Sequence, residues 1–265
     1  MELTIILTTY NWPESLLLAL HSIEKQTTLP SEVIIADDGS DFKTEKLVTK
    51  YKKKSKLKII HSWQKDIGFR VARSRNLAVL KSTGDYIILI DGDMILHPNF
   101  VKDHVVNAEE GFFVQGSRVF LSEKQTKNVI KENKINFSFF SPGLKNRKNS
   151  IHSNFFSRVF SRKNNSLKSI KSCNMGFFKE DFLKINGFNN DFEGWGREDS
   201  EFIVRMYNSG IYRKNIHFNA IQFHLWHKES SRSLMAKNNI ILNDSINNVS
   251  KWCENGINSV ERNES

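Results

Sequence analysis

Short runs of apolar residues alternate with longer amphipathic segments through the first hundred residues. Each run of Ile, Leu and Val is typical of a strand buried on both faces, and each longer segment has apolar positions at helical spacing. A repeated strand–helix pattern predicts a parallel sheet with right-handed crossovers. The predicted strands are residues 3–7, 32–36, 57–61 and 86–90, and the predicted helices begin at Pro13, at about residue 43 and after Gly68.

The second half of the chain is less regular, and longer polar stretches separate its predicted elements. Residues 138–170 are rich in Ser, Asn, Lys and Arg without clear periodicity, so we interpret them as a long loop. We expect one α/β domain with a mostly parallel sheet and a mixed second half, divided into residues 1–110 and 111–265. The predicted strands of the second half are residues 112–120, 171–178 and 216–223, and its predicted helices are 99–107, 122–136, 179–184, the segment after 198 and the tail from 231.

Polar residues follow three of the four predicted parallel strands, in residues 8–11, 37–40 and 91–93. The carboxyl ends of parallel strands share one edge of a sheet, which is where open α/β sheets bind ligands. Asp91 and Asp93 are two like charges at the end of a core strand, and such a pair is costly without a cation. A divalent metal meets that need and indicates a diphosphate ligand. A surface turn is the alternative for these acids alone, because Asp-Gly is a common turn pair, but three clusters at one edge favour a nucleotide site.

Charge and cysteine content narrow the class of protein. Residues 111–175 hold 13 Lys and Arg against two acids, so the net charge of +10 at pH 7 comes from this segment. Such a segment suits anionic lipid, nucleic acid or an acidic substrate, with a solvated loop as the alternative. Two cysteines form no disulfide framework or metal-ligand spacing, and we find no signal peptide or apolar window long enough to span a membrane. We therefore expect a cytoplasmic protein.

The three polar clusters resemble, in order and spacing, the nucleotide-sugar domain of inverting family 2 glycosyltransferases. Residues 194–199, Gly-Trp-Gly-Arg-Glu-Asp, resemble the Gly-Trp-Gly-Gly-Glu-Asp segment of β-1,4-galactosyltransferases and the related block of bacterial chondroitin polymerases. Residues 64–70, with Arg75 and Asn76, are similar to the polymerase type, and the resemblance covers about residues 1–230. It implies a GT-A fold, a UDP-sugar donor and a Mn²⁺ or Mg²⁺ ion.

The sequence also departs from the galactosyltransferase pattern. Arg197 stands where those enzymes have Gly, and Asp-Ser-Glu at 199–201 stands where they have a run of acids. Because this loop lies close to donor and acceptor in the family, the transferred sugar stays open between galactose, an N-acetylhexosamine, glucose and other donors. The expected acceptor is a hydroxyl of a surface glycan such as lipopolysaccharide or capsule.

The resemblance implies roles at a metal site. Asp93 would bind the metal directly, and Asp91 would contact the ribose or reach the metal through water. A histidine from the second half of the chain is the expected further ligand. His224 and His227 compete for that role, and we favour His227.

Inversion at the anomeric carbon needs a general base for the acceptor hydroxyl and charge neutralisation on the departing diphosphate. Asp199 is the candidate base, and Glu198 would hold an acceptor hydroxyl or orient the loop. Two acids favoured by the dipole in the first turn of a helix are the alternative. Trp195 between two glycines argues against that alternative, since it suggests a mobile or sugar-stacking loop.

The remaining candidates would bind the donor. Asp38 would accept a hydrogen bond from the uracil imide or the ribose, and Thr8 and Tyr10 would line the base. Arg75 would approach the uracil or the diphosphate, with a helix-face salt bridge as the alternative. The candidate donor-binding residues are Thr8, Thr9, Tyr10, Asp38, Gln64, Arg75, Asp91, Gly92 and Trp195.

The expected acceptor is a glycan or glycolipid, and this suggests a role for the basic segment. If the acceptor is lipid-linked, residues 145–171 could hold the protein on the inner face of the cell membrane, with Phe155, Phe156 and Phe160 inserting. A nucleic-acid binder leaves the acids at the strand ends unexplained, so we expect no nucleic-acid partner. A sugar-binding pseudoenzyme on the same fold is the other alternative, and the intact acids and histidines argue against it.

Overall fold

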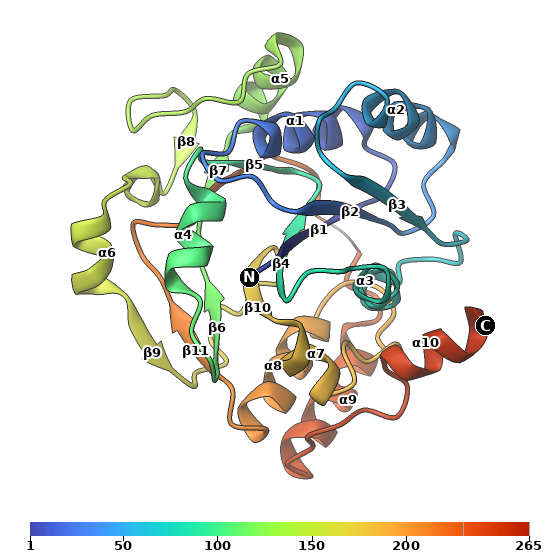
Figure 1. Cartoon of the computed structure of the whole chain (residues 1–265). Helices are drawn as coiled ribbons and strands as arrows, with labels where there is room; N and C mark the ends of the chain where they lie inside the picture. The colour runs from blue at the N-terminus through green and yellow to red at the C-terminus, as the bar shows by residue number, and fades with distance from the viewer. Residues whose placement is uncertain (230, 265) are drawn as a thin grey trace.

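A large mixed sheet forms the centre of the molecule (Figure 1). The computed structural model describes residues 1–229 and 231–264. Eight strands lie in the order β3-β2-β1-β4-β10-β6-β11-β9. These strands are β1 (Leu3–Thr9), β2 (Glu32–Asp37), β3 (Ile59–Trp63), β4 (Tyr86–Asp91), β6 (Phe112–Gln115), β9 (Arg162–Asn164), β10 (Asn174–Phe178) and β11 (Tyr212–Asn215).

The first four strands are parallel, which confirms the predicted strand–helix pattern. β1 pairs in parallel with β2 and β4, and β2 pairs in parallel with β3. The crossovers are α1 (Pro13–Glu24), α2 (Phe42–Lys52) and α3 (Val71–Leu80). The other α-helices are α4 (Phe100–Asn107), α5 (Glu123–Glu132), α6 (Asn154–Phe160), α7 (Lys179–Lys184), α8 (Glu198–Asn208), α9 (Met235–Asn247) and α10 (Ile257–Glu264).

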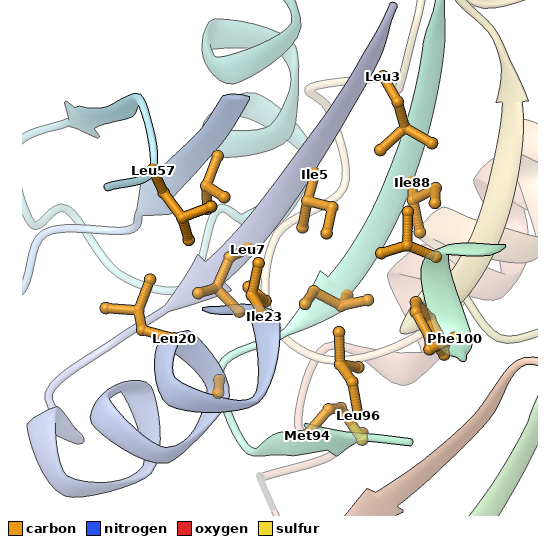
Figure 2. Packing of buried hydrophobic residues seen from close by; sticks show 14 of the residues in the cluster. Leu3, Ile5, Leu7, Leu20, Ile23, Leu57, Ile88, Met94, Leu96 and Phe100 are labelled. Atoms are coloured by element: carbon orange, nitrogen blue, oxygen red, sulfur yellow. The ribbon is translucent and has the colours of Figure 1, made fainter. Parts of the chain in front are cut away.

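Alternate residues of the parallel strands enter two separate cores. Ile5 and Leu7 of β1 pack with Leu20 and Ile23 of α1 on one face, as Figure 2 shows. Ile6 belongs to the core on the other face, together with residues of α3, α7, α8 and α10. Because both faces are covered, every residue of β1 is buried. Because alternate side chains pack into a core on each face of the sheet, the ends of the parallel strands are held in fixed positions.

The second half of the chain joins the sheet through an antiparallel strand. β10 lies between β4 and β6 and runs antiparallel to both. β11 then pairs with β6 in parallel, and β9 pairs with β11 antiparallel. The mixed second half expected from the sequence is confirmed.

A second sheet has four short strands in the order β5-β12-β7-β8. The prediction of one strand over 112–120 is wrong, because the chain breaks at Gly116 into β6 and β7, which belong to different sheets. A Cβ at Gly116 would approach the carbonyl oxygen of Ala220 to 2.5 Å. The two backbone segments are therefore too close at this point for any residue but glycine. The strands of this sheet are β5 (Met94–Leu96), β7 (Ser117–Leu121), β8 (Leu144–Lys145) and β12 (Ile221–His224).

The strands predicted over 57–61 and 171–178 are Ile59–Trp63 and Asn174–Phe178, and the limits of two further elements differ for a local backbone reason. The strand predicted over 216–223 begins only at Ile221, because Phe218 and Ala220 have φ angles of 60° and 46°. The helix predicted to reach residue 136 ends at Glu132, where Asn133 takes the left-handed conformation that often terminates a helix.

The basic segment contains regular structure, so the prediction of a continuous loop over 138–170 is wrong. It includes β8, a 3₁₀ turn at Arg147–Ser150, α6 and β9. The Ser153 side chain accepts a hydrogen bond from Phe156 N and caps α6, the short helix that contains Phe155, Phe156 and Phe160. Within residues 1–229 and 231–264, no helix is both long and apolar enough to cross a membrane.

Candidate active site

The carboxyl ends of β1 and β4 lie side by side. Thr8 and Asp91 are partners in the strand register, and Thr8 Oγ1 donates a hydrogen bond to Asp91 Oδ1 at 2.7 Å. Gly92 N donates to the Thr8 carbonyl at 2.6 Å, and a Cβ at Gly92 would come within 2.7 Å of that oxygen. The tight turn that separates Asp91 from Asp93 therefore requires glycine.

Asp93 meets two histidines that come from the far end of the chain. Its Oδ2 lies 3.1 Å from His224 Nε2 and 3.1 Å from His227 Nε2. Leu225 N donates to the Asp93 carbonyl at 3.0 Å and fixes the end of β12 against this turn. Both competing histidines thus reach the same carboxylate, and the geometry does not select His227 over His224.

The three side chains form a compact set of potential metal ligands. Their ligand atoms lie within 4.8 Å of one another, and Asp93 Oδ1 is buried with no hydrogen-bond partner in the described structure. Burial alone would raise the pKa of Asp93, but hydrogen bonds with His224 and His227 hold it well below its ordinary value. The same contact with Asp93 raises the pKa of His227 to about 9. An orphaned carboxylate oxygen beside two imidazoles fits a divalent cation.

Arg75 of α3 links this group to the start of α8. The arginine is only 3% exposed. Its Nη2 lies 3.3 Å from Asp91 Oδ1, and its Nη1 lies 3.4 Å from Glu198 Oε1. Its guanidinium also stacks over the Phe188 ring, 5.3 Å from the ring centroid. Arg75 is therefore a buried bridge between two carboxylates, and its approach to the uracil or the diphosphate stays a prediction.

The surroundings of Asp199 raise the pKa of its carboxyl group. Burial and the adjacent Glu198 carboxylate raise its pKa to about 7, against the opposing effect of Arg75. Ser200 Oγ donates to Asp199 Oδ1 at 3.2 Å. A carboxylate with a pKa close to neutral is matched to accepting a proton from a hydroxyl.

A buried ion pair holds α8 in place beneath Asp199. Arg205 donates to both carboxylate oxygens of Glu201 at 2.7 Å. Its Nη1 also donates to the carbonyls of Ile185 and Gly187, at 2.6 and 2.8 Å. Because this pair is fully buried and hydrogen-bonded, it fixes the first turns of α8 against the core.

The turn before α8 presents Trp195 at the surface. Gly194, Gly196 and Arg197 all have positive φ angles, of 68°, 103° and 78°. Trp195 is 41% exposed, and its ring faces the Arg232 guanidinium at 5.1 Å. Asn238 of α9 is fully buried and donates to the carbonyls of Glu193 and Gly196, so α9 determines the shape of this turn.

A second group of predicted donor-binding residues gathers at the end of β2. Asp38 Oδ1 accepts from Gln64 Nε2 at 2.5 Å, and its Oδ2 accepts from Arg70 N at 2.7 Å. The Thr9 carbonyl accepts from Asp38 N at 3.0 Å and joins this group to β1. Burial raises the pKa of Asp38 in spite of these hydrogen bonds.

Tyr10 lies at the outer side of this group, where its ring is half-exposed. Its hydroxyl donates to Asp66 Oδ2 at 3.0 Å. A cavity of about 300 Å³ adjoins Gln64 and is lined also by Trp63, Arg70 and Arg73, among others. A planar base would find an aromatic ring and hydrogen-bonding groups at this place.

Another cluster of two histidines and one aspartate lies near the start of β12. The His97 and His152 rings stack with centroids 4.6 Å apart and planes inclined by only 10°. Asp103 accepts hydrogen bonds from His152 Nε2 and from Ala220 N at 2.8 to 3.1 Å. Asp103 of α4 thus links His152 to Ala220, the residue just before β12, and the ligand atoms of His97, Asp103 and His152 lie within 4.8 Å of one another.

The structure thus brings the predicted residues together in three adjoining groups, around Asp93, Asp199 and Asp38. Their proximity is observed, and their chemical roles stay predictions. Several neighbours had no role assigned from the sequence, although Asp66 and Arg70 lie within the quoted segment 64–70. Neither Phe120 nor Asn238 belongs to a recognisable motif. The Phe120 ring lies 5.4 Å from the His224 ring, and Asn238 donates to the Gly196 carbonyl.

Solved structures identify the fold. TarS residues 1–349 from S. aureus, in complex with UDP, superposes with a TM-score of 0.62 at 18% identity, over 94% of this chain and 66% of that one. The mannosyltransferase PcManGT from Pyrobaculum calidifontis, in complex with GDP-Man and Mn²⁺, gives 0.57 at 18% identity, over 86% and 58%. The protein has the GT-A fold, as expected from the sequence.

Sequence comparison identifies the family. The model of glycosyl transferase family 2 matches residues 4–180, and one described as the N-terminal domain of galactosyltransferase matches residues 154–228. The chain belongs to glycosyl transferase family 2.

Relatives include the hyaluronan synthase of Pasteurella multocida, 28% identical over 81% of this chain and 24% of that protein. The chondroitin synthase of Escherichia coli is 28% identical over 81% and 33%. The validoxylamine A glucosyltransferase of Streptomyces hygroscopicus subsp. limoneus is 27% identical over 79% and 48%. The chain therefore matches only a quarter to a half of the length of these relatives.

Proposed function

We propose that the protein is an inverting, metal-dependent glycosyltransferase that moves galactose or an N-acetylhexosamine from a UDP-sugar to a hydroxyl of a surface glycan. The observation that carries the proposal is the arrangement around Arg75. This arginine joins the start of α8, where Asp199 has a pKa near 7, to the strand end that leads to Asp93, His224 and His227. The two groups that this chemistry needs, a base and a metal site, thus meet at one edge.

Asp93, His224 and His227 would hold the metal. Two imidazoles beside one carboxylate suit Mn²⁺ better than Mg²⁺, which favours oxygen ligands. When bound, the ion would neutralise charge on the departing diphosphate. Asp91 already accepts from Thr8 and Arg75 through Oδ1, so its Oδ2 is the atom left for the ribose or a metal-bound water. The complex of PcManGT with GDP-Man and Mn²⁺ supports a Mn²⁺ ion together with a nucleotide sugar.

The uridine would lie over the carboxyl ends of β1 and β2. Gln64 and the backbone of Arg70 orient the Asp38 carboxylate, which would accept from the uracil imide or the ribose. Tyr10 would cover the base from its half-exposed position beside Asp66. The complex of TarS with UDP supports a uridine nucleotide as the ligand of this edge.

Asp199 would take the proton of the acceptor hydroxyl as the hydroxyl oxygen attacks the anomeric carbon of the donor sugar. The bond from that carbon to the UDP oxygen breaks on the opposite face, which inverts the configuration. Glu198 is engaged by Arg75, so we assign it the orienting role and not direct contact with the acceptor. Trp195 is exposed beside this position and would stack on a sugar ring.

A donor screen tests the proposal. Release of UDP would be measured with UDP-galactose, UDP-N-acetylglucosamine, UDP-N-acetylgalactosamine and UDP-glucose, each with Mn²⁺ and with EDTA, and GDP-mannose would serve as the control nucleotide. We expect one or two UDP-sugars to turn over with Mn²⁺ and none with EDTA. Failure to bind or turn over any UDP-sugar would overturn the proposal. Binding without turnover would define a sugar-binding protein, and a preference for UDP-glucose would change the assigned donor.

We further propose that α6 rests on an anionic membrane surface near a lipid-linked acceptor. Its large apolar side chains are between 44% and 70% exposed. An apolar face of this kind on a short helix suits insertion at a lipid interface. The exposed residues are Phe155, Phe156, Val159 and Phe160.

Positive charge surrounds this apolar face. A cavity of about 580 Å³ beside α6 is lined by Lys102, Arg158 and Arg162, among others. These three cations have no ion-pair partner in the described part of the chain, whereas Lys163 and Lys214 pair with Glu109. Free cations beside apolar side chains favour a surface of anionic lipid headgroups.

Liposome flotation tests the membrane proposal. The protein should bind vesicles of phosphatidylcholine with phosphatidylglycerol at low salt, and lose binding at high salt or when Arg158 and Arg162 are changed to Gln. Changing Lys50 and Lys52 of α2 to Gln removes the same charge elsewhere and should leave binding intact. Equal binding to neutral and anionic vesicles, or no binding to either, would reject the proposal.

A further inference from the structure

Arg118 lies one aromatic ring away from the candidate metal ligands. β7 pairs in parallel with β12, with Arg118 beside Gln222 and Phe120 beside His224. Since alternate residues of a strand share a face, these four side chains lie on the same side of the small sheet. The Phe120 ring centroid is 5.4 Å from that of His224, and the Arg118 guanidinium stacks 4.5 Å from the Phe120 centroid.

Arg118 has no anionic partner within the described residues. Among the residues that the structure describes, its Nη1 approaches only the Cys173 thiol, at 3.5 Å, and its buried Nε has no hydrogen-bond acceptor. Gln222 also turns its Nε2 to that thiol, and its buried Oε1 has no partner in the described part of the chain. Sulfur is a weak acceptor, so a partly buried guanidinium is left without the hydrogen bonds that it normally forms.

Lys171 adds a second unpaired cation to this place. It precedes Cys173 by two residues, is partly buried, and forms no ion pair in the part of the chain that the structure describes. Burial, followed by the nearby charge of Arg118, lowers the pKa of Lys171. Two partly desolvated cations that repel each other are costly, and an anion between them would remove that cost.

Among the described residues, neither cation of the pair contacts a residue proposed to bind the donor. A row of contacts runs from Glu198 through Arg75 to Asp91, and from Asp93 through His224 to Phe120 and Arg118 (3.1 to 5.4 Å each). Arg118 is thus at the opposite end of this row from the proposed base. The pair would then bind a part of the acceptor away from the reacting hydroxyl, and UDP binding by the variants distinguishes this from contact with the donor diphosphate.

We propose that Arg118 and Lys171 bind an acidic group of the acceptor, namely the carboxylate of a uronic acid or the phosphate of a polyol phosphate. The inference rests on the proposed transferase function, which it extends to the class of acceptor. The planar guanidinium would bind two anionic oxygens side by side, and the ammonium would bind one of them from another direction. The unpartnered Gln222 Oε1 would accept from a neighbouring hydroxyl.

Titration calorimetry with saturating UDP and Mn²⁺ tests the inference. The probes are a tetrasaccharide of alternating glucuronate and N-acetylhexosamine, the same tetrasaccharide with its carboxylates reduced to alcohols, and a short ribitol-phosphate oligomer. The unchanged protein should bind one acidic probe about tenfold or more tightly than the neutral one, because an Arg–anion contact contributes at least that much. Which acidic probe binds distinguishes carboxylate from phosphate.

Matched variants locate the effect. Arg118→Gln and Lys171→Gln should each weaken the acidic probe about tenfold and leave UDP binding unchanged, and Arg118→Lys should keep part of the affinity. Lys124→Gln, which removes an exposed charge from α5, should behave like the unchanged protein. Equal binding of the neutral probe, binding of neither acidic probe, or full binding by Arg118→Gln would overturn the inference. Loss of UDP binding in Arg118→Gln would instead assign the pair to the donor phosphates. Failure of the unchanged protein to bind UDP would count against the proposed transferase function itself.

Discussion

The edge proposed to bind the donor and the side proposed to bind the acceptor differ in whether their cationic side chains have anionic partners. At the donor edge, Arg75 pairs with Asp91. On the acceptor side, Arg118 and Lys171 have no anionic partner among the described residues. Trp195 is likewise 41% exposed at the turn before α8.

This difference indicates two modes of binding. A site whose side chains already hold one another is preorganised, so little ordering free energy is lost when the nucleotide binds. A site with unpaired cations and an exposed indole leaves its interactions to be completed by the ligand. We therefore expect variants at the donor edge and the acceptor side to separate cleanly in binding and transfer assays.

The strongest test of this separation is Asp199→Asn. The amide cannot take the hydroxyl proton, so the rate of transfer should fall about 1000-fold, within the range that general-base catalysis contributes. UDP affinity should stay within about twofold, because among the described residues Ser200, and no donor-edge residue, hydrogen-bonds to the Asp199 side chain. Transfer would be measured by product formation and UDP binding by calorimetry.

Asp244→Asn is the matched control, since Asp244 is an exposed carboxylate on α9. It should leave both measurements unchanged. If Asp199→Asn keeps its transfer rate, the base is another residue, and catalysis is not assigned to the acceptor side. If UDP binding falls together with the rate, the two regions are not independent.

The second test concerns the two histidines, between which the geometry does not choose. His224→Gln and His227→Gln should each raise the Mn²⁺ concentration needed for half-maximal activity about 10- to 100-fold, because each removes one ligand. The measurement is a Mn²⁺ titration of UDP-sugar hydrolysis. An effect confined to one variant would show that the other imidazole is only a hydrogen-bond partner of Asp93.

The donor edge was largely predictable from the sequence because its signals are local. A continuous apolar run that ends in Asp91 and Asp93 predicts a buried strand with acids at its carboxyl end, and β4 with its turn confirms that layout. Thr8 and Asp38 follow neighbouring strands, so parallel topology alone brings them to one edge.

The acceptor side was less predictable because its contacts are distant in sequence and its strands are short. β5 has three residues, and β7 is separated from β6 only by the close approach at Gly116. The stacking of Arg118 on Phe120 beside His224 depends on the register of β7 with β12, which no local pattern reveals. The buried Asn238 that shapes the Trp195 turn comes from a helix about 40 residues later, with no motif around it.

A third test uses the pH dependence of transfer. The raised pKa of Asp199, about 7, means that the carboxyl is protonated and inactive below that pH. The rate at saturating Mn²⁺ and donor should therefore fall about tenfold for each pH unit below 7 and level off above it. The residual activity of Asp199→Asn should lack this dependence. An unchanged pH profile in that variant would assign the titration to another group.

The raised pKa of Asp199 also makes the stability of the fold depend on pH. The folded protein holds the Asp199 proton more tightly than the unfolded chain, so ionisation between about pH 4 and pH 7 destabilises the fold. Asp199→Asn should consequently gain thermal stability relative to the unchanged protein at pH 8 and not at pH 4. Thermal unfolding at the two pH values measures the difference.

The smallest expected effect on stability belongs to Arg197→Gly, at the position where the chain departs from the galactosyltransferase pattern. Arg197 has a φ of 78°, so glycine should relieve about 1 kcal/mol of backbone strain. The change also removes the hydrogen bond from Arg197 Nε to Asn239 Oδ1 at 2.8 Å, which contributes a similar amount. The midpoint of thermal unfolding should therefore hardly move.

The donor preference should nevertheless change in Arg197→Gly, because the side chain lies two residues from Trp195 and from the proposed base. Comparing UDP-galactose with the N-acetylhexosamine donors in the variant and in Asn239→Ala, which removes the same hydrogen bond but keeps the arginine, isolates the effect of the guanidinium. A shift in Arg197→Gly alone would place sugar selection at this turn. The same shift in both variants would show that the hydrogen bond to α9, by holding the turn, decides which donor sugar is transferred.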